Sequence, residues 1–201
     1  MDRTRLKAAL LAPVAAVSLT ACGINSIPTA EEDAKARWAD VQNQYQRRAD
    51  LIPNLVESVR GAAAQERNVL REVTEARANA TRIQLSPEQL RDPEAMARFS
   101  EAQARLTSAI IPLQRLQEAY PDLKTNQNFL TLQSQLEGTE NRITIARTDY
   151  NEAVRRYNTR IRTFPDVIGA KVFYGAEPMV PFQATTPGAE QAPKVDFGNG
   201  S

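Results

Sequence analysis

The chain has 201 residues, with 25 basic and 24 acidic side chains, and it contains no histidine. This balanced charge argues against a nucleic-acid-binding protein, which needs a concentrated basic face. The lack of histidine excludes Ser-His-Asp and Cys-His nucleophilic sites, nearly all zinc sites, and the Glu-x-x-His di-iron sites of helical bundles. We therefore expect no metal and no other cofactor.

The first 22 residues have the pattern of a processing signal. Arg3, Arg5 and Lys7 form a basic start, and residues 8–17 form an uncharged, largely aliphatic run. This run is shorter than the roughly 20 apolar residues of a membrane-spanning helix, but it fits a secretory signal. The string LTACG at the end of the run resembles the bacterial lipobox, in which the cysteine becomes the acylated N-terminus. We predict a lipoprotein signal peptide over 1–21 and lipidation of Cys22; an ordinary secretory peptide is the alternative.

Three stretches of apolar residues at heptad spacing follow a predicted lipidated tether over residues 22–30. In the first stretch, or seam, apolar residues recur every seven positions from Trp38 to Val59. The second seam runs in the same way from Phe99 to Tyr120, and the third from Phe129 to Phe164. Seams of this period place one apolar face along each helix. We therefore predict an all-α domain over 31–174, an antiparallel bundle of three to four long helices that begins at Glu31. The aromatic residues in the seams are interpreted as core.

Prolines divide the seams and set the expected helix boundaries. Ser86-Pro87 and Asp92-Pro93 could each begin a helix. Tyr120-Pro121 is a typical helix end, and Pro112 should kink or split the helix that contains it. A first helix reaching residue 80 would be far longer than its neighbour. The chain therefore either reverses near Asp50–Pro53, which gives four helices and is the interpretation we favour, or pairs its projecting part with another subunit.

The C-terminal part has a different character. Residues 166–174 could form one short helix or an extended apolar run. Four prolines exclude regular helix beyond residue 177, so we predict an extended or partly disordered tail over 175–201. Val195 and Phe197 are the residues expected to dock this tail, if any part of it is docked.

Two groups of polar residues stand out against the seams. The first surrounds Pro53 and the second lies on the third predicted helix; together they comprise Arg47, Arg48, Asp50, Asn54, Glu57, Glu140, Asn141, Arg147 and Asn151. Arg48 occupies a seam position, where an unpaired charge would be costly, and Glu140 is its expected partner. We interpret the groups as a structural polar network, with a partner-binding surface as the alternative and a catalytic site as the least favoured one.

Several ordered strings resemble the signatures of the LemA family. They are RRADLIPNLVE at 47–57, EAYPDLK at 118–124, TENRI at 139–143, and the Tyr-Asn pairs at 150–151 and 157–158. The resemblance extends from about Trp38 to Lys171. It implies a membrane-attached, extracytoplasmic helical bundle, although many members carry an N-terminal transmembrane helix where this chain has a lipobox. Some relatives are associated with magnetosome membranes, which favours organising membranes over catalysis.

These observations predict a non-enzymatic, lipid-anchored envelope protein that acts as a scaffold or adaptor. Its expected partners are the membrane and envelope proteins or a second copy, and not nucleic acid. One alternative is a module that binds a small apolar ligand between helices. A hydrolase that uses two of Glu57, Glu137 and Glu140 is the third possibility. Gly23, rather than an aspartate, follows the cysteine, which favours the outer membrane if the host has one.

Overall fold

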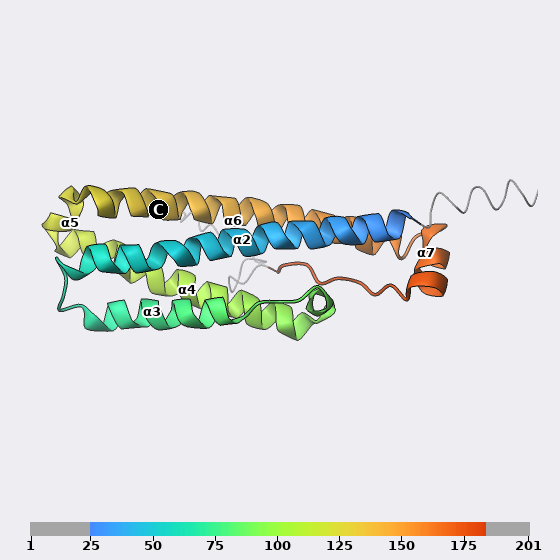
Figure 1. Cartoon of the computed structure of the whole chain (residues 1–201), viewed down its shortest axis with the longest axis horizontal. Helices are drawn as coiled ribbons and strands as arrows, with labels where there is room; N and C mark the ends of the chain where they lie inside the picture. Colours follow the sequence, from blue (N-terminus) through green and yellow to red (C-terminus); the bar gives the residue numbers. More distant parts are fainter. Residues whose placement is uncertain (1–24, 184–201) are drawn as a thin grey trace, which may run out of the picture.

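The computed structural model describes residues 25–183, which form an elongated bundle of four long helices (Figure 1). The long helices are α2 (Ser26–Arg60), α3 (Arg67–Arg82), α4 (Pro93–Ala119) and α6 (Gln127–Arg160). The shorter helical segments are η1 (Glu88–Arg91), α5 (Pro121–Thr125), α7 (Asp166–Gly169) and η2 (Ala170–Tyr174). The predicted all-α bundle is therefore confirmed, and the described part of the chain contains no strand.

The prediction that the chain reverses near Asp50–Pro53 is wrong in position. α2 continues through Pro53 to Arg60, and residues 61–66 turn the chain into α3. Pro53 cannot donate a hydrogen bond to the carbonyl of Ala49, four residues earlier. The guanidinium of Arg77 on α3 donates to that carbonyl instead, at 2.6 Å. A neighbouring helix thus supplies the hydrogen bond that proline removes, and α2 remains continuous.

Local signals define the other helix ends. Asp92 caps α4 by accepting a hydrogen bond from the amide of Glu94, and Asn126 caps α6 in the same way. α4 runs through Pro112 without being split. α2 begins at Ser26, five residues before the expected start at Glu31, because Ile27 is buried in the core. The last residues of the expected tether are therefore helical.

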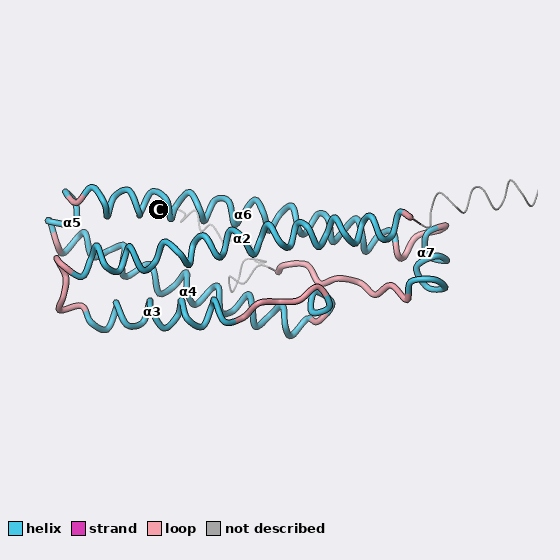
Figure 2. Tube along the Cα trace, in the orientation of Figure 1, coloured by secondary structure: helices cyan, strands magenta, loops and turns pink. Residues whose placement is uncertain are grey.

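The helices differ in length, and a C-terminal segment packs on the part of the core that the shorter helix α3 does not reach. At 1.5 Å per residue, α2 and α6 are each about 50 Å long, whereas α3 spans only about 24 Å. Beyond the end of α3, an extended segment of residues 176–183, which we call the strap, returns along the bundle from η2 (Figure 2). Met179 and Phe182 of the strap are buried in the core around Trp38. The described part of the predicted tail is thus extended and docks through Met179 and Phe182, whereas Val195 and Phe197 lie outside the described residues.

The predicted seams form most of the core. The exception is Phe164, the last member of the third seam: it was expected to be buried but is 80% exposed, because α6 ends at Arg160. Phe129, Leu136, Ile143 and Tyr150 are at most 3% exposed, as expected for the third seam. The remaining uncertain stretch, residues 166–174, is helical and comprises α7 and η2. None of the described helices combines the length and the apolar character needed to span a membrane.

Candidate functional site

Arg48 lies at the centre of a polar layer that crosses the bundle. Its side chain is 1% exposed and projects from α2 between α4 and α6. One terminal nitrogen donates to Glu140 and to the Thr107 hydroxyl, each at 2.8 Å. The other donates to the side-chain oxygen of Gln103 at 2.7 Å and to its backbone carbonyl at 3.2 Å. We call Arg48, Gln103, Thr107 and Glu140 the arginine layer.

The arginine layer separates two apolar cores. Its members lie one turn from residues of both cores: Arg48 lies between Tyr45 and Ile52, and Glu140 lies between Leu136 and Ile143. The Gln103 amide also donates to the backbone carbonyl of Ala80 at 3.2 Å, which joins α3 to the layer. All four long helices therefore meet in one hydrogen-bonded plane. A slip of any helix by one turn would leave these polar groups unpaired, so the layer fixes the helix register.

The charges in the layer have unequal access to water. The side chain of Glu140 is 40% exposed, whereas that of Arg48 is 1% exposed. The Arg48 guanidinium also lies over the Tyr45 ring, 5.1 Å from its centre. Burial raises the pKa of the Tyr45 phenol, and the positive charges of Arg147 and Arg48 oppose that rise. Among the described residues, the Nε atom of Arg48 has no acceptor.

Two asparagines on α6 hold the backbone of the strap. Asn158 accepts from the amide of Met179 at 2.9 Å and donates to the carbonyl of the same residue at 2.8 Å. Asn151, one heptad earlier, binds the amide and the carbonyl of Phe182 at 2.7 and 3.1 Å. The spacing fits because seven helical residues and three extended residues each span about 10 Å. One asparagine per heptad thus matches every third residue of the strap.

Tyrosines and prolines complete the hydrogen bonding of the strap. Tyr157 and Tyr150, which precede the two asparagines, donate to the carbonyls of Glu177 and Val180 at 3.0 Å each. The amide of Val180 donates to the carbonyl of Leu90 at 2.8 Å. The other two positions between residues 178 and 182 are prolines, which have no N–H to satisfy. Every backbone amide from 178 to 182 is therefore paired.

Phe182 anchors the strap through aromatic contacts. Its ring stacks on Trp38 with a centre-to-centre distance of 5.6 Å and meets Tyr150 edge-on at 5.8 Å. The guanidinium of Arg147 covers the Phe182 ring at 4.9 Å and donates to the carbonyl of Gln183 at 3.3 Å. Burial raises the pKa of the Tyr150 phenol, which keeps that group neutral as a donor. The strap is thus an integral part of this core.

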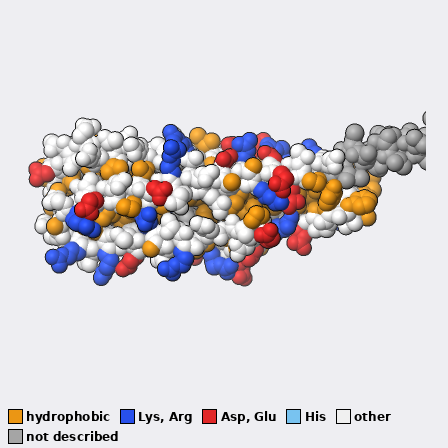
Figure 3. All heavy atoms as spheres, viewed as in Figure 1, with side chains coloured by type: hydrophobic (Ala, Val, Ile, Leu, Met, Phe, Trp, Pro, Cys, Tyr) orange, Lys and Arg blue, Asp and Glu red, His pale blue; other side chains and the backbone are white. Residues whose placement is uncertain are grey.

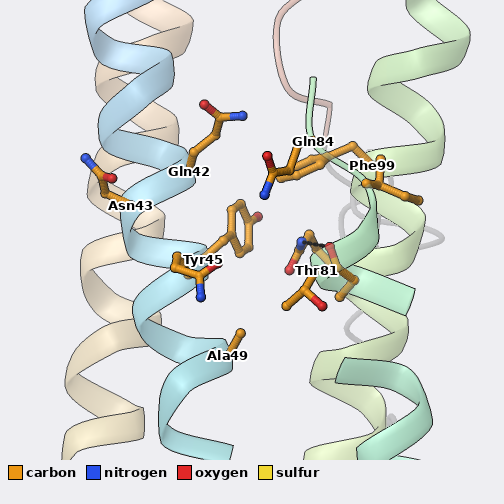
Figure 4. A pocket seen from close by; sticks show the side chains of 11 residues that line it. Gln42, Asn43, Tyr45, Ala49, Thr81, Gln84 and Phe99 are labelled. Carbon is orange, nitrogen blue, oxygen red and sulfur yellow. Dashed lines mark hydrogen bonds between the residues drawn. The ribbon is translucent and has the colours of Figure 1, made fainter. Parts of the chain in front are cut away.

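A hollow of about 220 Å³ opens beside Tyr45, which projects into it from α2 (Figure 4). Much of its lining consists of side-chain amides, from Gln42, Asn43, Gln46, Gln84 and Gln103. A small apolar ligand requires a mostly apolar pocket, so this hollow does not suit the ligand that was considered as an alternative. In the part of the chain that the structure describes, no group of His, Cys, Asp or Glu side chains could hold a metal ion.

The polar residues singled out in the sequence do not form one site. Arg48 and Glu140 meet in the arginine layer, whereas Arg147 and Asn151 hold the strap. The other five are exposed, namely Arg47, Asp50, Asn54, Glu57 and Asn141. Of these, Asp50 accepts from Gln46 at 2.7 Å, and Glu57 pairs with Arg60 at 3.0 Å. Cys22 lies outside the described residues.

Sequence reasoning missed Gln103, Thr107 and Asn158. Gln103 lies next to the seam residue Ala102 and does not itself fall on the heptad pattern. Its burial depends on the neighbouring helices. The role of Asn158 had a visible signal: the Tyr-Asn pair recurs one heptad apart, and Pro178 and Pro181 recur three residues apart. Those two periods together describe a helix that binds an extended segment.

The sequence is similar to that of known proteins. Magnetosome proteins MamQ 1 and MamQ 2 of Paramagnetospirillum magneticum (strain AMB-1) are each 24% identical to the chain over 172 residues. The similarity covers 78% of this chain and 63% of each relative, so the chain spans less than two thirds of their length. The LemA family model matches residues 37–197, which is well over half of the sequence. The protein therefore belongs to the LemA family.

Proposed function

We propose that the protein is a non-enzymatic, lipid-anchored envelope protein that acts as a scaffold or adaptor for other envelope components. Membership of the LemA family and similarity to two magnetosome proteins support membrane association. The lipobox supports an anchor on Cys22, and a lipoprotein with two or more acyl chains stays on its membrane. The anchor places the bundle on the extracytoplasmic side.

The non-enzymatic part of the proposal rests on one observation: the candidate polar residues are engaged in contacts that hold the fold together. The buried arginine is neutralised and hydrogen-bonded by Glu140, Gln103 and Thr107, and the α6 asparagines are committed to the strap. Of the acids considered for a hydrolase, Glu57 pairs with Arg60, Glu137 accepts from Gln133, and Glu140 pairs with Arg48. These contacts stabilise a rigid bundle, which is what a scaffold requires.

The sides of the bundle offer a surface for partners. A shallow groove of about 430 Å³ runs between α4 and α6, with Ile111 and Asn141 in its lining. Ile111 is 42% exposed, and Asn141 belongs to the polar residues selected from the sequence. A groove with an exposed apolar side chain and adjacent amide and carboxylate groups suits the core and rim of a protein interface.

Photocrosslinking in intact cells tests this proposal. Benzoylphenylalanine is introduced in place of Ile111 or Asn141, and in place of Arg71 on the exposed face of α3 as the control. We expect the same envelope protein to crosslink from both groove positions and not from the control. The proposal is contradicted if the groove positions give no adduct above the control while the protein is shown to be folded and present in the envelope.

A further inference from the structure

Large apolar side chains are exposed at the end of the bundle where α2 begins. Within residues 25–183, eight large hydrophobic side chains are exposed, and five of them fall within residues 164–174. These five, which we call the end patch, are Phe164, Ile168, Val172, Phe173 and Tyr174, with exposed fractions of 80, 53, 69, 66 and 43%. Figure 3 shows apolar side chains gathered at this end of the molecule.

α7 and η2, which carry most of the end patch, bury small residues and expose large apolar ones, the opposite of a core-forming helix. Gly169 and Ala170, the small residues, are buried, whereas Ile168, Val172 and Phe173 face solvent. A helix that packs on a core normally buries its large apolar side chains. Folding alone therefore gives no reason for these residue types, and a cluster of this kind marks a contact surface.

The end patch lies beside the point at which the predicted anchor joins the bundle. The Ser26 hydroxyl donates to Asp166 at 2.8 Å, and Arg160 donates to the carbonyl of Ser26 at 3.5 Å. Cys22 precedes Ser26 by four residues, which reach about 14 Å at most. The strap, in contrast, carries the chain away, because Gln183 binds Arg147, about 20 Å along α6 from Arg160. A lipid on Cys22 would therefore be tethered close to the end patch.

We propose that the end patch inserts into the membrane interface, so that the bundle stands on the bilayer by this end. The inference rests on the proposed lipid anchor. The exposed Lys171 lies in the same segment and can meet anionic headgroups, while Tyr174 is a residue type favoured at membrane interfaces. α5 and the turn at residues 61–66 lie at the opposite end of the bundle (Figure 1). The long sides of the helices would then remain accessible to protein partners.

Fluorescence quenching by brominated lipids tests insertion in the mature lipidated chain, reconstituted in vesicles of phosphatidylcholine and phosphatidylglycerol. The single native tryptophan, Trp38, is 3% exposed and provides the background. Phe173→Trp adds an indole in the end patch, and Ile145→Trp adds one at a similarly exposed position midway along α6. We expect quenching at least about twofold stronger for Phe173→Trp. Equal quenching of the two variants would overturn the inference.

Vesicle flotation of unlipidated residues 23–201 separates the patch from the anchor. This chain contains both apolar cores of the described bundle. Phe164→Ser with Phe173→Ser should lower the vesicle-bound fraction about tenfold, whereas Ile111→Ser with Ile145→Ser should leave it unchanged. If fatty-acid labelling of Cys22 fails but flotation behaves as expected, the proposed anchor is wrong and the patch stands.

Two other occupants of the end patch have distinct outcomes. If the patch variant converts a dimer to a monomer in sedimentation and vesicle binding is absent, a second copy covers the patch and the inference is overturned. If the chain binds vesicles only after residues 184–201 are deleted, the C-terminal tail covers the patch, which also overturns it.

Discussion

Breaking the ion pair between Arg48 and Glu140 should destabilise the bundle asymmetrically. Glu140→Leu leaves a guanidinium that is 1% exposed without a counterion, while the pair itself is partly screened because Glu140 is 40% exposed. Removing one partner of a buried pair costs roughly 3–5 kcal/mol, and partial screening by water places this case at about 3 kcal/mol. Glu140→Gln retains an acceptor for Arg48 and should cost less, which separates the loss of charge from the loss of the hydrogen bond.

Arg48→Met should cost less than Glu140→Leu. The carboxylate that it leaves behind can turn to water, and Gln103 loses one partner for its side-chain oxygen. Such a loss corresponds to about 1–3 kcal/mol. The double variant replaces the pair with apolar side chains, so it should be more stable than the sum of the singles predicts, by about 2 kcal/mol.

A double-mutant cycle by urea denaturation of residues 23–201 provides the measurement. Circular dichroism gives the free energy of unfolding for the wild type, both single variants and the double variant, at unchanged m-value. Additivity within about 0.5 kcal/mol would show that the two residues are not energetically coupled and would refute the role given to the arginine layer. Stable single variants with a clear cellular defect would instead assign the pair a functional role.

Four other changes have defined expectations. Ile143→Ala should lower the free energy of unfolding by about 2–5 kcal/mol, because Ile143 is 3% exposed; an unchanged thermal melt would contradict its place in the core. Burial raises the pKa of Tyr150 above its ordinary 10.0, so the unfolded chain loses that proton first and stability should fall as the pH rises above about 10. Tyr150→Phe should reduce this loss of stability with rising pH, measured by urea denaturation at several alkaline pH values. An equal loss in the wild type and the variant would refute the effect assigned to Tyr150. Asn158→Leu should speed amide exchange of Met179 without unfolding α6, as judged by hydrogen-exchange NMR. Gly175 has φ +53°, so Gly175→Ala should destabilise the start of the strap by about 1 kcal/mol in urea denaturation, which a neutral effect would contradict.

Heptad spacing predicted most of the bundle because the same residues that define the seams are those that are buried. The pairing of Arg48 with Glu140 was predictable for a related reason: a charge within an apolar seam requires a partner on the facing helix. The family resemblance added the expected location at a membrane. The seams follow from a regular period along the sequence, and the ion pair follows from a charge that interrupts one of the seams.

The features that were not predicted depend on residues distant in sequence. The reversal was placed at Pro53, but α2 continues through that point, and Arg77, 24 residues later, donates to the carbonyl that Pro53 leaves without a partner. The docking of the strap depends on α6 side chains about 20–30 residues earlier, which no local pattern in the tail reveals. The structure of residues 166–174 was ambiguous from the sequence because their large apolar residues are not the ones that pack against the core.

Fatty-acid labelling at Cys22 tests the central claim, that lipid holds this bundle at a membrane. Cells that produce the full chain, or its Cys22→Ala variant, are grown with an alkynyl fatty acid, and the purified proteins are coupled to a fluorophore. We predict strong labelling of the wild type and none of the variant, which should persist as an uncleaved or mislocalised precursor. Equal labelling of the two proteins, or labelling of neither, would contradict the account.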